Sequence, residues 1–179
     1  MKGINVEIGY VAVETFLTTE KYREWSKLHH VKEVVSLDCA LCPNVLDNNN
    51  EDDLIYLQND GFYYDIVNNL DKLISKVQNV KDKQILAVSR NPENDCSNLI
   101  IDGRFKFYGY DLLEDDTRIS ALVNCGGFDK AFNPQDISEY GLIKDFKKAK
   151  EVQFLLANEY PYENHVFCTL WAIWKMKDI

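Results

Sequence analysis

The chain has 179 residues, of which 46% are hydrophobic and 27% are charged. This composition excludes general disorder, because disordered chains combine low hydrophobicity with high charge. The formal net charge of −9 and the lack of a basic run exclude a nucleic-acid partner of the usual kind, since such binding depends on Lys and Arg that neutralise phosphates.

A chain of this length is expected to form a single globular domain over residues 1–179, because domains typically have about 100–200 residues. No run approaches the roughly 18 apolar residues that span a bilayer, and no secretory signal opens the sequence. The five cysteines are an odd number and are expected to be free thiols. We therefore predict a cytoplasmic protein without a membrane partner.

The first elements are predicted from periodicity and capping residues. Apolar and polar residues alternate over 4–12, as in a strand with one buried face. Thr18 or Thr19 can cap a short helix that ends near His30. Residues 31–35 then predict a second strand.

The middle of the chain contains the strongest helical pattern. A polar stretch over 47–53 predicts a solvated loop, and apolar residues at spacings of three and four predict a long helix over about 62–80. Residues 85–88 predict a short buried strand. Asp102-Gly103 predicts a hairpin turn, because this dipeptide tolerates positive φ, and a meander of antiparallel strands would follow.

Two runs further along, 104–113 and 118–128, resemble strands joined by the acidic link 114–117. We predict that they form the central hairpin of a sheet. A helix is expected over about 145–160, after a shorter one that begins at Asn133-Pro134.

The last run, 166–176, is apolar on both faces and therefore predicts a strand in the middle of the sheet. Together the elements predict an α+β fold, an antiparallel sheet of about five or six strands with helices packed on it. The alternative is a parallel, doubly wound fold, in which the strands near 4–13, 85–88 and 166–176 would run in the same direction.

Four side chains have the types and the paired spacing of a zinc site. They are Cys39, Cys42, His165 and Cys168. His165 and Cys168 lie three apart at the start of a predicted strand, however, where alternation sends them to opposite faces. We expect no bound metal and no cofactor, with the zinc site as the alternative.

Cys125 precedes two glycines at the end of a strand-like run, where backbone N–H groups could surround a thiolate. With His165 as its base, Cys125 would serve a cysteine-dependent hydrolase or transferase. A small buried cysteine and turn-forming glycines explain the same residues without catalysis. Enzymatic activity is therefore the alternative to a binding function.

Three stretches carry a resemblance: 109–113 (GYDLL), 119–128 (ISALVNCGGF) and 165–173 (HVFCTLWAI). They are similar to a group of small uncharacterised bacterial proteins that share the pattern GYDL, ISALxNCGGF and HxxCxLWAI. The resemblance covers about residues 85–176. It implies one ordered domain and no particular activity.

In size and acidity the chain is also similar to immunity proteins that neutralise bacterial toxins, a likeness of composition only. The residues expected to bind are acidic and aromatic neighbours in the sequence: Glu51, Asp52, Asp53, Tyr56, Tyr63 and Tyr64. Charges that steer an encounter beside aromatic anchors are a common interface composition. We predict a binding or inhibitory protein for a basic protein partner, against the simpler alternative of a solvated loop and core aromatics.

Overall fold

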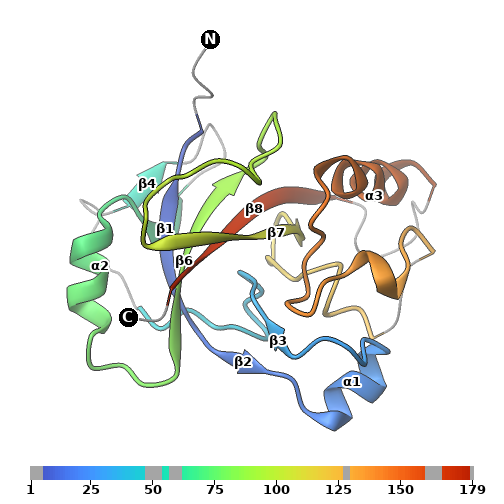
Figure 1. The fold of residues 1–179 in the computed structure, drawn as a ribbon, viewed down its shortest axis with the longest axis horizontal. Helices are drawn as coiled ribbons and strands as arrows, with labels where there is room; N and C mark the ends of the chain where they lie inside the picture. Colours follow the sequence, from blue (N-terminus) through green and yellow to red (C-terminus); the bar gives the residue numbers. More distant parts are fainter. Residues whose placement is uncertain (1–5, 47–53, 57–61, 127–129, 160–166, 178–179) are drawn as a thin grey trace.

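The computed structural model describes residues 6–46, 54–56, 62–126, 130–159 and 167–177. The chain folds as an α+β structure around one antiparallel sheet of six strands, in the order β4-β5-β1-β6-β8-β7 (Figure 1). Its strands are β1 (Gly9–Glu14), β4 (Leu54–Tyr56), β5 (Phe62–Val67), β6 (Lys83–Arg90), β7 (Phe105–Glu114) and β8 (Cys168–Met176). A separate ribbon pairs β2 (Phe16–Leu17) with β3 (Glu33–Val34). The predicted α+β class is confirmed.

The parallel alternative is wrong, because β1 pairs antiparallel with β6 and β6 pairs antiparallel with β8. The prediction for the last strand is confirmed, since β8 lies between β6 and β7. Alternate residues of β8 enter both layers of the core: Trp171 is 2% exposed and Trp174 is 1% exposed. A strand with two buried faces needs apolar residues throughout, and this explains the unbroken apolar run.

The helices are α1 (Glu20–Ser26), α2 (Leu70–Val77) and α3 (Phe146–Glu159), with a 3-10 turn, η2, over Pro134–Asp136. As expected, Thr19 caps α1: its hydroxyl accepts a hydrogen bond from the Tyr22 N–H at 3.1 Å. The Asn69 side chain caps α2 in the same way, through the Lys72 N–H at 3.0 Å. Figure 1 shows α2 and α3 at opposite ends of the sheet, and α1 with β2 and β3 below it.

Neighbouring residues of β7 show what covers each face of the sheet. The Tyr110 ring packs on Phe146 of α3, with centroids 5.3 Å apart. Asp111, the next residue, points to the opposite face and contacts Ser36. One face is therefore covered at this end by α3, and the other by the segment that follows β3.

The long helix predicted over 62–80 is wrong. Residues 62–67 form strand β5, and the helix α2 begins only at Leu70. Aromatic and β-branched residues dominate 62–67 and favour a strand, whereas Asn69 is a helix cap that separates the two elements.

The predicted central hairpin is also wrong. β7 is an edge strand, and residues 119–126 form turns that touch it through an isolated bridge between Leu113 and Ser120. The segment does not form a strand because the amide and the hydroxyl of Ser120 donate hydrogen bonds to two buried aspartates, Asp38 and Asp111. The Asp102-Gly103 hairpin is wrong as well, because Asp102 instead accepts a hydrogen bond from the Arg104 N–H at 2.8 Å, and residues 99–101 form no strand.

Candidate functional site

Asp111 is a carboxylate fully buried in the protein, with 0% exposure. Its Oδ1 accepts hydrogen bonds from the Ser120 hydroxyl at 2.6 Å and from the Leu112 N–H at 2.8 Å. Its Oδ2 accepts one from the Ser36 hydroxyl. Three neutral donors thus surround this side chain.

Asp38 is a second carboxylate with 0% exposure. Its Oδ1 accepts from the N–H groups of Ala40 (2.8 Å) and Leu41 (3.1 Å), which closes a tight turn. Its Oδ2 accepts from the Ser120 N–H at 2.7 Å. Ser120 therefore links both aspartates, one through its amide and the other through its hydroxyl.

This cluster of Ser36, Asp38, Asp111 and Ser120, called here the carboxylate cluster, joins β7 to two loop segments. Burial raises the pKa of Asp111 to about 6, the hydrogen bonds from Ser120 and Ser36 lower it, and the charge of Asp38 raises it further. Both carboxylates are closed off from solvent, so the cluster is placed to hold the loops rather than to meet a substrate.

The loops that the cluster holds include the turn that follows β7. The Asp115 N–H donates to the carbonyl of Phe167 at 3.2 Å, and the Arg118 N–H donates to the carbonyl of Glu114 at 2.9 Å. Arg118 has a φ of 56°, which is uncommon for a residue other than glycine and closes the turn. The turn is therefore fixed both to the residue before β8 and to itself.

Two exposed acidic residues of this turn lie near an exposed aromatic residue, to which the turn is joined by a backbone hydrogen bond. Asp115 and Asp116 are exposed, and Phe167 is 80% exposed directly before β8. We call these three residues the acidic–aromatic surface. Arg90 lies beneath it, 3.7 Å from Asp115, and the Thr169 hydroxyl donates to the same carboxylate. Asp115 is thus held in place, and the backbone hydrogen bond keeps Phe167 beside it.

The turn around Cys125 lies against α1. The Tyr22 hydroxyl donates to the Val123 carbonyl at 2.7 Å. Gly126 has a φ of 68°, and a Cβ there would lie 2.9 Å from the Trp25 ring. Cys125 is half-buried in this turn, and His165 lies outside the described residues. The Cys125 and His165 pair therefore stays a prediction.

The cysteines of the predicted zinc site have different surroundings. Cys39 is exposed and its Sγ lies 3.1 Å from Nη2 of Arg118, whereas Cys42 is buried with its Sγ 3.4 Å from the Val34 carbonyl. Burial raises the pKa of Cys42 to about 12, which opposes formation of the thiolate that zinc requires. Cys168 is buried at the start of β8. Within the described ranges no three His, Cys, Asp or Glu residues are grouped to hold a metal, and the site including His165 stays untested.

Of the predicted binding residues, only the three tyrosines belong to described strands. Glu51, Asp52 and Asp53 fall outside the described residues. Tyr56 belongs to β4, and Tyr63 and Tyr64 belong to β5, but their side chains are not among those described. Because β4 and β7 are the two edge strands, the strand of Tyr56 and the strand that leads into the acidic–aromatic surface lie at opposite edges of the sheet.

The sequence analysis missed both the carboxylate cluster and the acidic–aromatic surface. Asp111 stands in an otherwise apolar part of β7, and an isolated acid in such a run was an available signal for a buried polar cluster. The sequence predicts Phe167 as part of a strand covered on both faces, whereas β8 begins only at Cys168. Nothing in the sequence indicated Asp38, which becomes a partner only through the fold.

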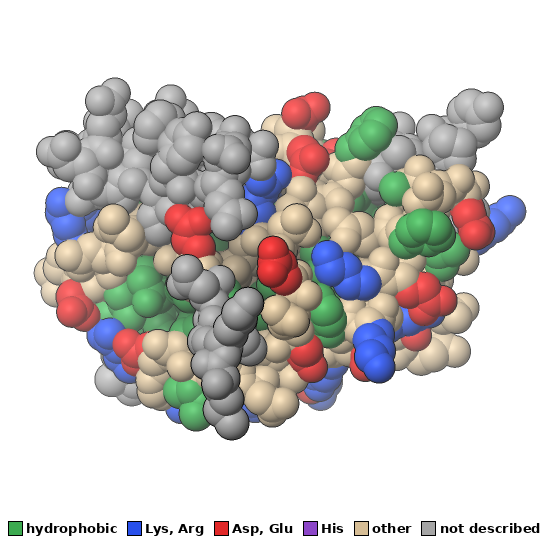
Figure 2. All heavy atoms as spheres, turned by 90° about the horizontal axis from the view of Figure 1, so that it is seen from above, with side chains coloured by type: hydrophobic (Ala, Val, Ile, Leu, Met, Phe, Trp, Pro, Cys, Tyr) green, Lys and Arg blue, Asp and Glu red, His purple; other side chains and the backbone are tan. Residues whose placement is uncertain are grey.

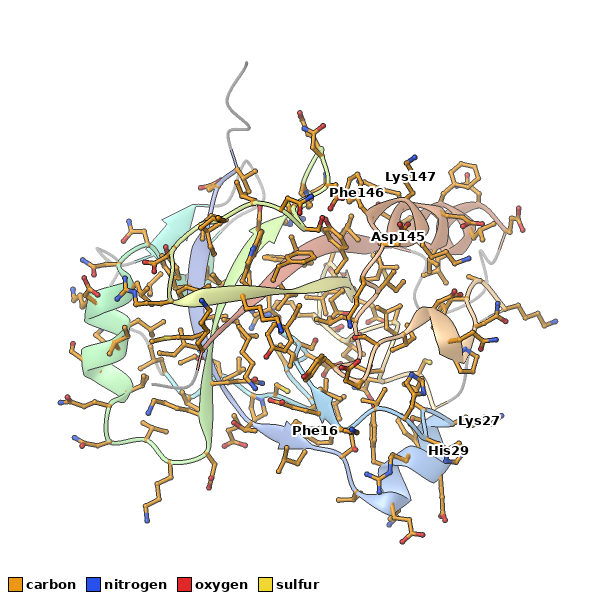
Figure 3. The ribbon with its side chains drawn as sticks, in the orientation of Figure 1. Phe16, Lys27, His29, Asp145, Phe146 and Lys147 are labelled. Carbon is orange, nitrogen blue, oxygen red and sulfur yellow. The ribbon has the colours of Figure 1, made fainter. Side chains whose placement is uncertain are left out.

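A groove of about 470 Å³ runs between η2 and the start of α3. Asp145 lies at the start of α3 (Figure 3) and caps it through the Lys148 N–H at 2.7 Å. Lys148 lies 3.7 Å from Asp136. Two of the charges that line the groove, Lys148 and Asp136, are therefore paired with each other, and Lys144 pairs with Glu139. Seen from above α3, acidic, basic and apolar side chains are interspersed (Figure 2).

Comparison of the chain with protein-family models, with curated proteins and with solved structures finds no match. Among the described helices, none has the length and apolar character required to cross a membrane.

Proposed function

We propose that this protein binds a basic protein partner, and that it acts as an immunity-type inhibitor of a basic toxin. The observation that carries the proposal is the acidic–aromatic surface, where Phe167 is 80% exposed beside Asp115 and Asp116. A net charge of −9 favours approach of a basic protein from any direction. The resemblance in size and acidity to immunity proteins supports the class of inhibitor.

Phe167 supplies the apolar part of the contact. Full burial of a phenylalanine side chain is worth about 1.5–3 kcal/mol, and folding leaves most of this gain unused at Phe167. A partner that covers the ring would recover it. Aromatic anchors next to charged groups are the usual composition of binding hot spots.

The position of the surface also favours binding. Its backbone is fixed by the hydrogen bond from the Asp115 N–H to the Phe167 carbonyl, and the carboxylate cluster holds the segment that follows the turn. A surface fixed before binding loses less conformational entropy when a partner docks. The acids would then raise the association rate and Phe167 would slow dissociation.

Affinity capture tests the proposal. The wild-type chain and the variant Asp115→Lys/Asp116→Lys are used as baits in native lysate at 0.1 M and 0.5 M salt. We expect a basic protein to be captured at 0.1 M salt, where exposed charges are screened only beyond about 10 Å. The captured amount should fall at 0.5 M salt, because screening becomes stronger. It should also fall with the variant at 0.1 M salt, because the variant reverses two of the attracting charges. If the same amount of partner is captured at both salt concentrations and with the charge-reversed variant, the proposal of a basic partner is contradicted.

Two further baits locate the contact. Glu7→Lys/Glu24→Lys makes the same change in net charge at exposed acids outside the surface, and it should reduce capture less. Glu51→Lys/Asp52→Lys/Asp53→Lys tests the loop predicted from the sequence. If this loop variant alone loses the partner, the partner contacts the acids of 51–53 and the acidic–aromatic surface has no part in binding.

A further inference from the structure

Cys39 and Cys42 lie in one tight turn that Asp38 holds. The Cys42 N–H donates to the Asp38 carbonyl at 2.7 Å, four residues back along the chain, as in a single turn of an α-helix. The Asp38 carboxylate accepts from the N–H groups of Ala40 and Leu41, and no residue of this turn has a positive φ. In such a turn, Cα atoms three residues apart are about 5 Å from each other. Disulfides join Cα atoms about 4.4–6.8 Å apart, so the two cysteines lie within reach of a bond.

The two thiols differ in their access to solvent. Cys39 is exposed, whereas Cys42 is 1% exposed and its thiol donates to the Val34 carbonyl at 3.4 Å. A small oxidant in solution therefore meets Cys39 first. Cys42 lies behind it in the same turn, where burial protects its sulfur from direct attack.

Arg118 distinguishes Cys39 as the sulfur to be oxidised. Its Nη2 lies 3.1 Å from the Cys39 Sγ, and arginine only donates hydrogen bonds, so the sulfur is the acceptor. The form of cysteine that attacks a peroxide is the thiolate, an anion that a guanidinium donor stabilises. Redox-sensing cysteines combine such a setting with solvent access and a second cysteine that resolves the oxidised form. Cys39 has all three.

Two other cysteines are less well placed to bond with the exposed thiol. Cys96 belongs to the opposite face of the sheet, because its N–H donates to the Tyr110 hydroxyl at 2.7 Å and the Tyr110 ring packs on α3. Cys125 is nearer, since the side-chain amide of the preceding Asn124 donates to the Asp38 carboxylate at 3.4 Å. Cys125 belongs to a separate segment, however, and a bond to it would have to draw two segments together.

We propose that Cys39 and Cys42 form a peroxide-sensitive thiol–disulfide pair, in which the exposed thiol is oxidised first and the buried thiol then closes a disulfide across the turn. Disulfides in reducing compartments are usually transient and serve redox sensing or catalysis. The pair does not depend on the proposed partner, because neither cysteine belongs to the acidic–aromatic surface.

The chemistry has two steps and consumes one molecule of hydrogen peroxide. In the first step, the Cys39 thiolate attacks one peroxide oxygen, an S–O bond forms, the O–O bond breaks, and the departing hydroxide leaves as water with the proton that the thiol has lost. In the second step, the Cys42 sulfur attacks the sulfur of this sulfenic acid, an S–S bond forms, the S–O bond breaks, and hydroxide leaves as a second water with the Cys42 proton. The two sulfurs together lose two electrons, which the peroxide gains. Burial raises the pKa of Cys42 to about 12, but its proton needs to leave only in this step, and attack within one turn is intramolecular.

Peroxide treatment of the reduced full chain tests the pair. The protein is kept with a chelator, which excludes zinc, and is then oxidised with a small excess of hydrogen peroxide, alkylated and digested with trypsin. Both cysteines fall in the single peptide 33–72, because no Lys or Arg lies within 33–71. We expect this peptide to lose two hydrogen atoms and to resist alkylation, whereas Cys96 stays reduced. Dithiothreitol should restore both thiols.

Three substitutions give the comparison. Cys39→Ser should leave Cys42 reduced under the same treatment, because burial keeps peroxide away from it. Cys42→Ser should stop the reaction at the sulfenic acid, so that dimedone labels Cys39 about tenfold more than in the wild type. Cys96→Ser is the matched control, since it removes a buried thiol on the opposite face of the sheet and should leave the disulfide unchanged.

If Cys42→Ser does not fold, the wild-type peptide alone decides. An internal disulfide in peptide 33–72 supports the pair. Three results would each overturn it under conditions that oxidise free cysteine: two alkylated cysteines in this peptide, sulfinic acid at Cys39 without a disulfide, or a disulfide that joins Cys39 to Cys125.

Discussion

At the scale of single residues, Asp111 is the side chain whose ionisation should affect stability most. Its pKa in the folded state, about 6, is raised above the unfolded value of 3.8, so the folded protein holds a proton between these values that the unfolded chain has lost. Stability from this group is therefore full below pH 3.8 and falls as pH rises toward 6. This direction is opposite to that of an aspartate in an ion pair.

We predict that the unfolding free energy of the wild type, relative to that of Asp111→Asn, falls by about 2 kcal/mol between pH 4 and pH 7. Urea unfolding of both proteins at several pH values measures the difference. Asp111→Ala should be less stable than Asp111→Asn at pH 7, because it leaves the Ser36 and Ser120 hydroxyls without their acceptor. A difference that rises with pH would show that Asp111 is stabilised as a carboxylate instead.

The cysteines should differ in reactivity according to their burial. Cys39 is exposed beside Arg118, whereas burial raises the pKa of Cys42 to about 12 and that of Cys96 to about 11. We expect iodoacetamide at pH 8 to modify Cys39 at least tenfold faster than Cys42 or Cys96, as followed by mass spectrometry, because the thiolate is the reactive form. Rapid modification of Cys42 would contradict its buried position. Rapid modification of Cys125 well below pH 8 would instead favour the enzymatic alternative.

At the scale of elements, the contact between α1 and the Cys125 turn depends on a glycine. Gly126→Ala would place a Cβ 2.9 Å from the Trp25 ring at a residue with positive φ, and we expect a loss of about 1–3 kcal/mol in stability and a shift in tryptophan fluorescence. Gly103→Ala is the matched control, because no atom lies within 4 Å of its added Cβ. Equal stability of the two variants in thermal unfolding would contradict the packing of Trp25 on Gly126.

The elements that could be predicted from the sequence are those whose local signals agree with their tertiary contacts. Thr19 marks the start of α1, and the doubly apolar run of β8 marks an internal strand. The prediction of one helix over about 62–80 is wrong because the apolar spacing of these residues fits a helix, although the strand β5 occupies their first part. The prediction of a strand over 119–126 is wrong because Ser120 donates a hydrogen bond to Asp38, which is 82 residues away in the sequence. A local sequence pattern does not include a partner at that distance.

At the scale of the whole molecule, the strand order decides how the acidic residues can act. The fold places β4 and β7 at opposite edges, and the acidic–aromatic surface adjoins the β7 edge. The sequence could show the acidic excess, but only the fold shows which acids share an edge with an exposed aromatic ring. The net charge of −9 attracts a basic protein to the molecule as a whole, and specific contacts must select the surface that binds it.

The most direct measurement is the dissociation constant of the captured basic partner, determined by calorimetry at 0.1 M salt. The account predicts at least tenfold weaker binding for Phe167→Ala, because the exposed ring becomes buried on docking, and a similar loss for Asp115→Lys/Asp116→Lys. Phe154→Ala removes another exposed phenylalanine, on α3, and should leave the affinity within about twofold of wild type. Binding that is unchanged by Phe167→Ala and by both charge reversals at Asp115 and Asp116 would contradict the account.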